Sequence, residues 1–493
     1  MNTLAQYLWL NAEFIRNVRA QLRLKRLLIA GIISGIVSLV IIPAMVPHRT
    51  SVASPSDEWA YTRWVLGVQS IILIIGGGIA CLQSIGREKE QNTFDYQRIT
   101  RLSPLELTLG KLFGAPVMSW FVALCFVPAA LAGLQSSTMS GEDLLSAWIL
   151  LVCTALAFHA FALMLSMLLT RALSTGAVLL FLFFSFFTIV PGMAVIVTTG
   201  QQANRRAAEI VFYGNSFPYT PFFCVIFLSF AAWFLLALVR NIKRDPTDYE
   251  FYRPFQALAF AAYISFLCMG AIPAATSTPV TVQTQALWTE QAVFFAFGLV
   301  LLRNRHRARR RLRLLGERGE SWLEAIWPGP FLLLGVLITA LLPILFFPSS
   351  TYHKMPWDAS LYVFRWVFFA LWICRDVQFL QWMDVQPGRR PLLRAILYEI
   401  IFYAATAALF FTSSRPVAAS EAAFQSIFTP ARVWAMDTAG WDEASSMWLV
   451  ALLCQAGAFL LFAFLHRHEL RSLAAARKPS PPSITSPTPA VAR

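Results

Sequence analysis

Long runs of apolar residues constrain this chain more than any other feature of its sequence. A helix needs about 20 predominantly apolar residues to cross the hydrocarbon core of a bilayer. Only 13% of the 493 residues are charged, whereas soluble domains carry about 25%. The sequence therefore predicts an all-α fold, a polytopic transmembrane helical bundle of about 12 spans. The spans are expected near residues 27–46, 65–85, 112–134, 146–169, 173–198, 219–239, 255–275, 286–302, 328–348, 360–381, 393–412 and 446–465.

The positive charges are confined mostly to alternate loops between these runs. One side of the predicted membrane holds 31 of the 40 Lys and Arg residues. Short cytoplasmic loops carry this excess in membrane proteins, so both termini are expected in the cytoplasm. The net charge of +14 therefore indicates orientation and contact with anionic lipids. We expect no nucleic-acid partner, because the most basic stretch, 303–320, adjoins a span and contains no interleaved aromatic residues.

The distribution of charged and apolar segments predicts five regions. Residues 1–26 combine apolar stripes with basic side chains, which favours an amphipathic interfacial helix; an ordinary charged flank of the first span is the alternative. Residues 27–240 hold six spans, 241–254 form a cytoplasmic link, 255–470 hold six further spans and 471–493 form a disordered tail. A shift of 288 residues sets Arg87 over Arg375, which indicates either a degenerate repeat or a chance alignment of apolar helices.

The loop between the second and third spans carries an unusual mixture of charges. Acidic residues are interspersed among its basic ones, and such a surface suits a protein partner better than a phosphate backbone. We call residues 86–111 the elbow. Its charged candidates for contact with a partner are Arg87, Glu88, Glu90, Asp95, Arg98 and Arg101.

A helix-start signal follows these charges within the elbow. Ser103 can serve as the N-cap, Pro104 as the first helical residue and Glu106 as the third, which completes a capping box. Proline also disfavours helical backbone at the preceding residue. One helix should therefore end near residue 101, and another should begin at Pro104 and continue into the third span. These three residues complete the set of interface candidates.

The same segment resembles the cytoplasmic connection of ABC-2 type permeases. Its matching residues are Arg87, Glu88, Glu90, Thr93 and Asp95, then Leu102, Ser103, Pro104 and Glu106, and finally Gly110, Lys111 and Leu112. The resemblance implies that the elbow contains a coupling helix that docks onto a separate cytoplasmic ABC ATPase, which binds ATP and Mg. It also implies a multi-pass protein of the cell membrane, the inner membrane in a bacterium, and small extracellular helices within 199–217. Either one chain supplies both halves of the permease, or a second permease chain pairs with it.

Ionisable residues inside predicted spans are the remaining candidate sites. Arg365 and Glu399 could form a buried pair between neighbouring helices or a substrate or proton site, since intramembrane charges are costly and often functional. His159 is more typical of a hydrogen-bonded core histidine than of a ligand. The seven cysteines include no CxxC pair, so neither disulfides nor a metal site is expected.

The chain carries no GxxxxGK[ST] phosphate-binding loop. We therefore expect a transporter subunit rather than an enzyme, with no cofactor of its own. The predicted function is that of an ABC-2 type exporter permease driven by ATP hydrolysis on a separate chain. An ion-coupled secondary transporter and a non-transporting membrane scaffold are the alternatives.

Overall fold

The computed structural model describes residues 11–45, 60–135, 140–168, 209–213, 215–244, 252, 254–275, 305–306, 308–309, 312, 359–388, 391–410, 418–428 and 438–475. The chain divides into two units. The first comprises Met1–Ile210 and Ser216–Phe251, and the second Val211–Asn215 and Tyr252–Arg493. The division at residue 251 falls inside the segment 241–254 that the sequence marks as a link. Predicted spans at 173–198, 286–302 and 328–348 lie outside the described residues.

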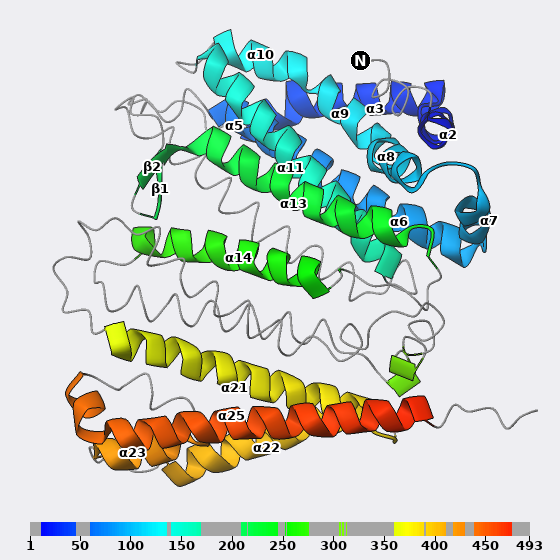
Figure 1. The fold of residues 1–493 in the computed structure, drawn as a ribbon. Coiled ribbons are helices and arrows are strands. Elements are labelled where there is room, and N and C mark those ends of the chain that lie inside the picture. The colour runs from blue at the N-terminus through cyan, green and yellow to red at the C-terminus, as the bar shows by residue number, and fades with distance from the viewer. Residues whose placement is uncertain are drawn as a thin grey trace, which may run out of the picture. The chain divides into compact units, whose positions relative to one another are not determined.

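The described part of the first unit is built from helices that continue one another with short breaks (Figure 1). Proline and glycine at several of these joints limit regular helix, which explains why one span consists of several named pieces. In chain order the elements are α2 (Ala12–Gln21), α3 (Leu24–Ile36), η1 (Val37–Ile41), α4 (Ile42–Met45), α5 (Ala60–Ser70), η2 (Ile71–Gly76), α6 (Gly77–Glu90), α7 (Phe94–Ile99), α8 (Pro104–Gly114), α9 (Val117–Cys125), α10 (Val127–Gln135), α11 (Gly141–Leu168) and α13 (Tyr219–Asn241).

The described part of the second unit is also mainly helical. Its helices are α14 (Pro254–Ala275), α21 (Ala359–Val385), α22 (Pro391–Phe410), α23 (Ala419–Ser426) and α25 (Thr438–Ala475). α21 packs along α25, and α22 and α23 pack against this pair. A small core forms where α21 meets α23 and α25, around Phe368, Phe369 and Trp448. Because α25 continues to Ala475, helix extends past the expected start of the tail at residue 471.

Six described helices are long and apolar enough to cross a membrane. They cover Leu24–Ile41, Tyr61–Glu90, Pro104–Leu134, Gly141–Met167, Tyr219–Asn241 and Ser445–Leu473. All six overlap predicted spans. α14, α21 and α22 also coincide with predicted spans, although they are not among the six. The structure therefore supports a multi-pass helical membrane protein, and the count of about 12 stays a prediction.

A β-hairpin precedes α13, where the family resemblance implied small helices. β1 (Glu209–Phe212) and β2 (Asn215–Pro218) pair as a two-stranded sheet. The expectation for 199–217 is therefore wrong over the residues described. Tyr213 adopts a left-handed backbone with φ 49°, which turns the chain sharply between the strands. Pro218 then provides an extended N-cap for α13. Arg205 and Arg206 lie outside the described residues.

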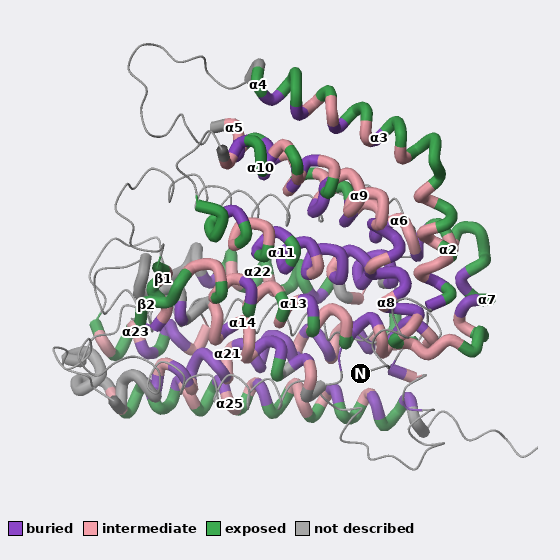
Figure 2. The backbone as a smooth tube through the Cα atoms, turned by 90° about the horizontal axis from the view of Figure 1, so that it is seen from above, coloured by how far each residue is buried: buried purple, intermediate pink, exposed green. Residues whose placement is uncertain are grey.

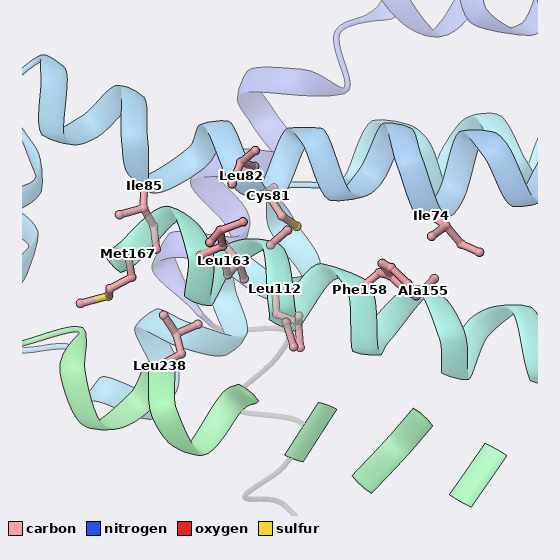
Figure 3. Close-up of a cluster of buried hydrophobic side chains, with 14 of the residues drawn as sticks. Ile74, Cys81, Leu82, Ile85, Leu112, Ala155, Phe158, Leu163, Met167 and Leu238 are labelled. Carbon is pink, nitrogen blue, oxygen red and sulfur yellow. The ribbon is translucent and has the colours of Figure 1, made fainter. Parts of the chain in front are cut away.

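The core of the first unit surrounds α11. This helix packs against α6 and α13, and apolar side chains from α6, α8, α11 and α13 meet in one cluster (Figure 3). Ile85, Leu112, Leu163 and Leu238 belong to it. Because lipid tails are as apolar as these side chains, close packing rather than escape from water stabilises such a cluster within a membrane.

His159 of α11 lies at the centre of this unit and is 0% exposed. Its Nε2 atom is 2.9 Å from the carbonyl oxygen of Leu73, which lies in the π-helical segment η2. A π-bulge alters the regular backbone hydrogen bonding of a helix. Since a carbonyl only accepts, Nε2 carries the proton and donates to it. This arrangement agrees with the expectation of a hydrogen-bonded core histidine.

By contrast, residues of α3 are exposed over most of its length (Figure 2). Leu24, Leu28, Ile32 and Ile36 are all more than half exposed. They recur about every four residues and form a continuous stripe along the helix. A soluble protein would bury such a stripe, whereas lipid accommodates it directly.

A substitution at Gly77 tests how tightly the side chains around His159 are packed. A Cβ atom at Gly77 would lie 2.3 Å from His159 Nε2, so Gly77→Ala overpacks a closed core and should cost about 1–3 kcal/mol. The expected result is a lower thermal unfolding midpoint in detergent. Gly31→Ala is the matched control, because a Cβ there meets nothing within 4 Å. Equal effects of the two substitutions would contradict this account.

Candidate functional site

The elbow leaves the second span through a tight helix-ending turn. Asn92 has φ 55°, its backbone N–H donates to the Lys89 carbonyl at 3.1 Å, and the Thr93 N–H donates to the Glu88 carbonyl at 2.9 Å. This pair of bonds is a Schellman motif, in which asparagine can replace the usual glycine. The chain therefore reverses from α6 into α7 without leaving the last carbonyls of α6 unpaired.

The predicted start of the next helix is confirmed. α7 ends at Ile99 and α8 begins at Pro104. The Ser103 hydroxyl accepts from the Glu106 N–H at 3.2 Å, and the Glu106 carboxylate accepts from the Ser103 N–H at 2.6 Å. This reciprocal pair is the capping box expected from the sequence. The capping box fixes the residue at which α8 begins. From there the chain continues through α9 and α10, and these three helices form the third described span.

α7 has one face turned inward and one turned outward. Phe94 is 2% exposed and belongs to the core of the first unit, and Gln97 is also buried. Asp95, Tyr96 and Ile99 are exposed, with Ile99 exposed over 82% of its surface. One face of α7 therefore packs on the core of the first unit, and the opposite face is exposed.

Lys111 is the buried charge around which the elbow is organised. Its side chain is 0% exposed, and its Nζ lies 3.1 Å from a Glu13 oxygen and 2.5 Å from a Glu88 oxygen. Arg16 contacts the same two carboxylates, Glu13 at 2.7 Å and Glu88 at 2.6 Å. Two positive and two negative charges thus form a neutral group, and Gln97 donates a further bond to Glu88 at 2.7 Å. We call these four charged residues the Lys111 cluster.

Two glycines allow α2 to approach α8 closely enough for this cluster to form. A Cβ atom at Gly110 would lie 2.7 Å from Glu13 Cβ, and one at Gly114 would lie 2.9 Å from Asn17 Cβ. Gln21 donates to the Gly114 and Ala115 carbonyls at 3.3 and 3.0 Å. Small residues one turn apart commonly permit such close helix contacts in membranes. A polar stripe of α2 therefore faces α8.

Two lysines connect the elbow to the remaining described spans of the first unit. Lys89 donates to the carbonyl oxygens of Ser166, at 3.1 Å, and Met167, at the end of α11. Lys243, just after α13, donates to the Thr100 carbonyl at 2.9 Å. Lysine near a helix C-terminus also interacts favourably with the helix dipole.

The nine predicted interface residues divide by exposure. Glu88 turns inward: its side chain is 14% exposed and belongs to the Lys111 cluster. The exposed members are Arg87, Glu90, Asp95 and Arg101, and the partly buried ones are Glu88, Arg98, Ser103, Pro104 and Glu106.

Sequence reasoning missed Glu13 and Tyr96, and gave Lys111 only as part of a motif. Glu13, Asn17 and Gln21 recur every fourth residue, and this spacing could have indicated a packed polar face. The apolar stripe through Phe14 and Val18 drew attention to the other side of the helix. Glycines at positions 110 and 114 were the matching signal on α8.

Two of the three intramembrane candidates belong to the second unit. Arg365 and Glu399 belong to α21 and α22 of the second unit. Glu399 has electrostatic interactions with Asp376 and Arg375, residues that the sequence reading did not select. Among the residues described, no three His, Cys, Asp or Glu side chains come together in a way that could hold a metal ion.

Charge reversal tests the Lys111 cluster. Glu88→Lys or Lys111→Glu alone leaves a buried group with two excess charges, and breaking such a group typically costs about 3–5 kcal/mol. The double variant restores neutrality and should recover part of the lost thermal stability. Glu90→Lys is the control, because Glu90 is exposed, and it should leave the unfolding midpoint unchanged. A double variant no more stable than the worse single variant would contradict the pairing.

Comparison with known families agrees with this architecture. A family model described as ABC-2 type transporter matches residues 10–199. No curated protein and no solved structure matches the chain. The matched stretch contains α2 to α11, and with them every member of the Lys111 cluster. Over residues 10–199, this multi-pass membrane protein is therefore similar to the ABC-2 type transporter family.

Proposed function

We propose that this chain is the permease subunit of an ATP-driven exporter whose ATPase is a separate cytoplasmic polypeptide. The chain lacks a phosphate-binding loop, so ATP and Mg would bind the partner. Closure of the ATPase on ATP would move the elbow, and the elbow would tilt the spans between inward-open and outward-open states. Transport would then be a shift between two conformations, driven by the state of the bound nucleotide.

One observation carries the proposal: the elbow joins the second and third described spans and contacts α2, α11 and the end of α13. The Lys111 cluster joins α2, α6 and α8, which continue into or end the first three described spans. Lys89 and Lys243 link the elbow to α11 and α13. A displacement of α7 would therefore reach five helices through short polar contacts. Packed elements linked in this way move together rather than deform independently.

The outer face of α7 has the composition of a docking surface. Tyr96 and Ile99 expose most of their apolar surface, although the charge distribution predicts that this segment lies in water. Asp95, Arg101 and Glu90, close to them in the sequence, are also exposed and carry charges of both signs. Protein interfaces commonly combine a central apolar or aromatic contact with a polar rim. This surface is our candidate for the ATPase contact.

The docking surface is tested by Ile99→Asp in the full-length chain. The substitution places a charge at the centre of the apolar patch, and the ATP-hydrolysing activity that co-purifies with the chain should fall at least about tenfold, equivalent to about 1.4 kcal/mol of binding. Phe217→Ala is the control, since Phe217 is an exposed aromatic residue on β2. Co-purifying activity that Ile99→Asp leaves unchanged would argue against the docking surface.

Substitutions at Glu88 and Glu90 test two roles of the elbow separately: transmission of movement to the spans, and docking of the ATPase. Glu90→Lys alters the rim of the docking surface, so it should weaken ATPase association without lowering the thermal stability of the chain. Glu88→Gln keeps the shape of the side chain but removes a charge from the Lys111 cluster. The associated ATPase should then continue to hydrolyse ATP while conformational change in the spans, followed by spin labels on α11, is reduced.

Failure of either variant to show its own defect would contradict the assigned role. Substrate movement in sealed vesicles that is abolished by an uncoupler and needs no ATP would favour the alternative of ion-coupled transport.

A further inference from the structure

The second unit contains a buried ion pair formed by adjacent residues of α21. Arg375 and Asp376 are both less than 10% exposed, and Arg375 Nε donates to the Asp376 carboxylate at 2.8 Å. Tyr403 of α22 joins them: its hydroxyl accepts from Arg375 at 2.6 Å and donates to Asp376. Trp372 also donates to this hydroxyl at 2.7 Å. The guanidinium therefore neutralises Asp376 directly.

A residue of α25 completes the shell of hydrogen bonds around the pair. Gln455 accepts from Arg375 at 2.9 Å and donates to the carbonyl of Ile427 at 2.8 Å. Its amide is thus oriented by the end of α23. The described contacts satisfy the charged atoms of the Arg375–Asp376 pair and use the Tyr403 hydroxyl twice as an acceptor and once as a donor.

Glu399 adds a second carboxyl group to this neutral pair. It lies four residues before Tyr403 on α22, one helical turn away, and interacts electrostatically with both Asp376 and Arg375. Its Oε1 atom is buried and accepts no hydrogen bond from the residues that the structure describes. Two carboxyls therefore lie within electrostatic range of one guanidinium. If both were ionised, the group would hold one negative charge in excess.

α21 is the described element that makes extensive contact with α22, and its Arg375 and Asp376 interact electrostatically with Glu399. Apart from Arg375, the one cationic residue of α21 is Arg365. Arg365 lies ten residues before Arg375 on α21, about 15 Å along the helix axis. An excess charge in a low-dielectric environment is costly. Within the described group, a proton or a small cation at Glu399 would remove this excess charge.

We propose that Glu399 is a proton-binding site of the second unit. The carboxylate takes up one proton from solution and becomes a neutral carboxyl, and no other bond is formed or broken. A metal cation fits less well, because hard cations prefer six or more oxygen ligands, whereas the Asp376 and Tyr403 oxygens are already engaged. This inference concerns the second unit and does not depend on an ATPase partner.

Infrared difference spectroscopy on the full-length protein in lipid nanodiscs tests the proposal. Buffers are varied between about pH 6 and pH 10, where exposed carboxyls with ordinary pKa values near 4 stay ionised. A carboxyl C=O band that disappears as the pH rises is expected for the native chain. Glu399→Gln should abolish this band, and Glu142→Gln, which alters an exposed carboxyl of α11, should retain it. Persistence of the band in Glu399→Gln would overturn the proposal.

A second variant keeps the test decisive if Glu399→Gln does not fold. Asp376→Asn frees Arg375 to pair with Glu399, and a nearby positive charge favours the ionised carboxyl. The midpoint at which the band disappears should therefore move to lower pH. An unchanged midpoint would overturn the inferred arrangement. Loss of the band on adding Na⁺ at constant pH, with choline as the control cation, would show a metal-cation site and would likewise overturn the proton assignment.

Discussion

The buried charge of Lys111 is the interaction on which the first unit depends. A lysine with no exposed surface requires negative partners, and Glu13 and Glu88 supply them from two other helices. Those carboxylates in turn require Arg16 to balance the charge. Each member therefore restricts the position of the others. Helix α2 and the ends of two membrane helices meet in one geometry because alternative geometries would leave a charge buried without a partner.

Small residues and local helix irregularities make this arrangement sterically possible. Gly110 and Gly114 let α2 lie directly on α8, while Gly77 leaves room for the His159 ring. The η2 segment directs the Leu73 carbonyl toward His159. In a membrane, backbone groups released from regular helix must find partners within the protein. Helix packing and backbone hydrogen bonding therefore account for most of the polar residues inside this unit, without any contact with a substrate.

The two units satisfy buried charge in different ways. The Lys111 cluster contains equal numbers of positive and negative side chains and has a polar edge at Arg16, which is half exposed. Around Arg375, the described side chains include two carboxyls and one guanidinium. A balanced group holds helices together at one geometry. The net charge of an unbalanced group changes when it binds an ion or a proton. We therefore assign a mechanical role to the Lys111 cluster and a binding role to the group around Arg375.

Local sequence determined much about this protein. Apolar runs indicated the six described spans, and the order Ser103, Pro104, Glu106 indicated where α8 begins, because a helix cap depends on residues only three positions apart. The elbow residues likewise indicated the family whose model matches residues 10–199. Tertiary structure alone decided which charges of the elbow face outward. Glu88 and Glu90 look equivalent in the sequence, but Glu88 meets a lysine 23 residues away and, through it, a glutamate 98 residues from that lysine. Contacts over such separations depend on how the helices pack, and no local pattern of residues specifies them.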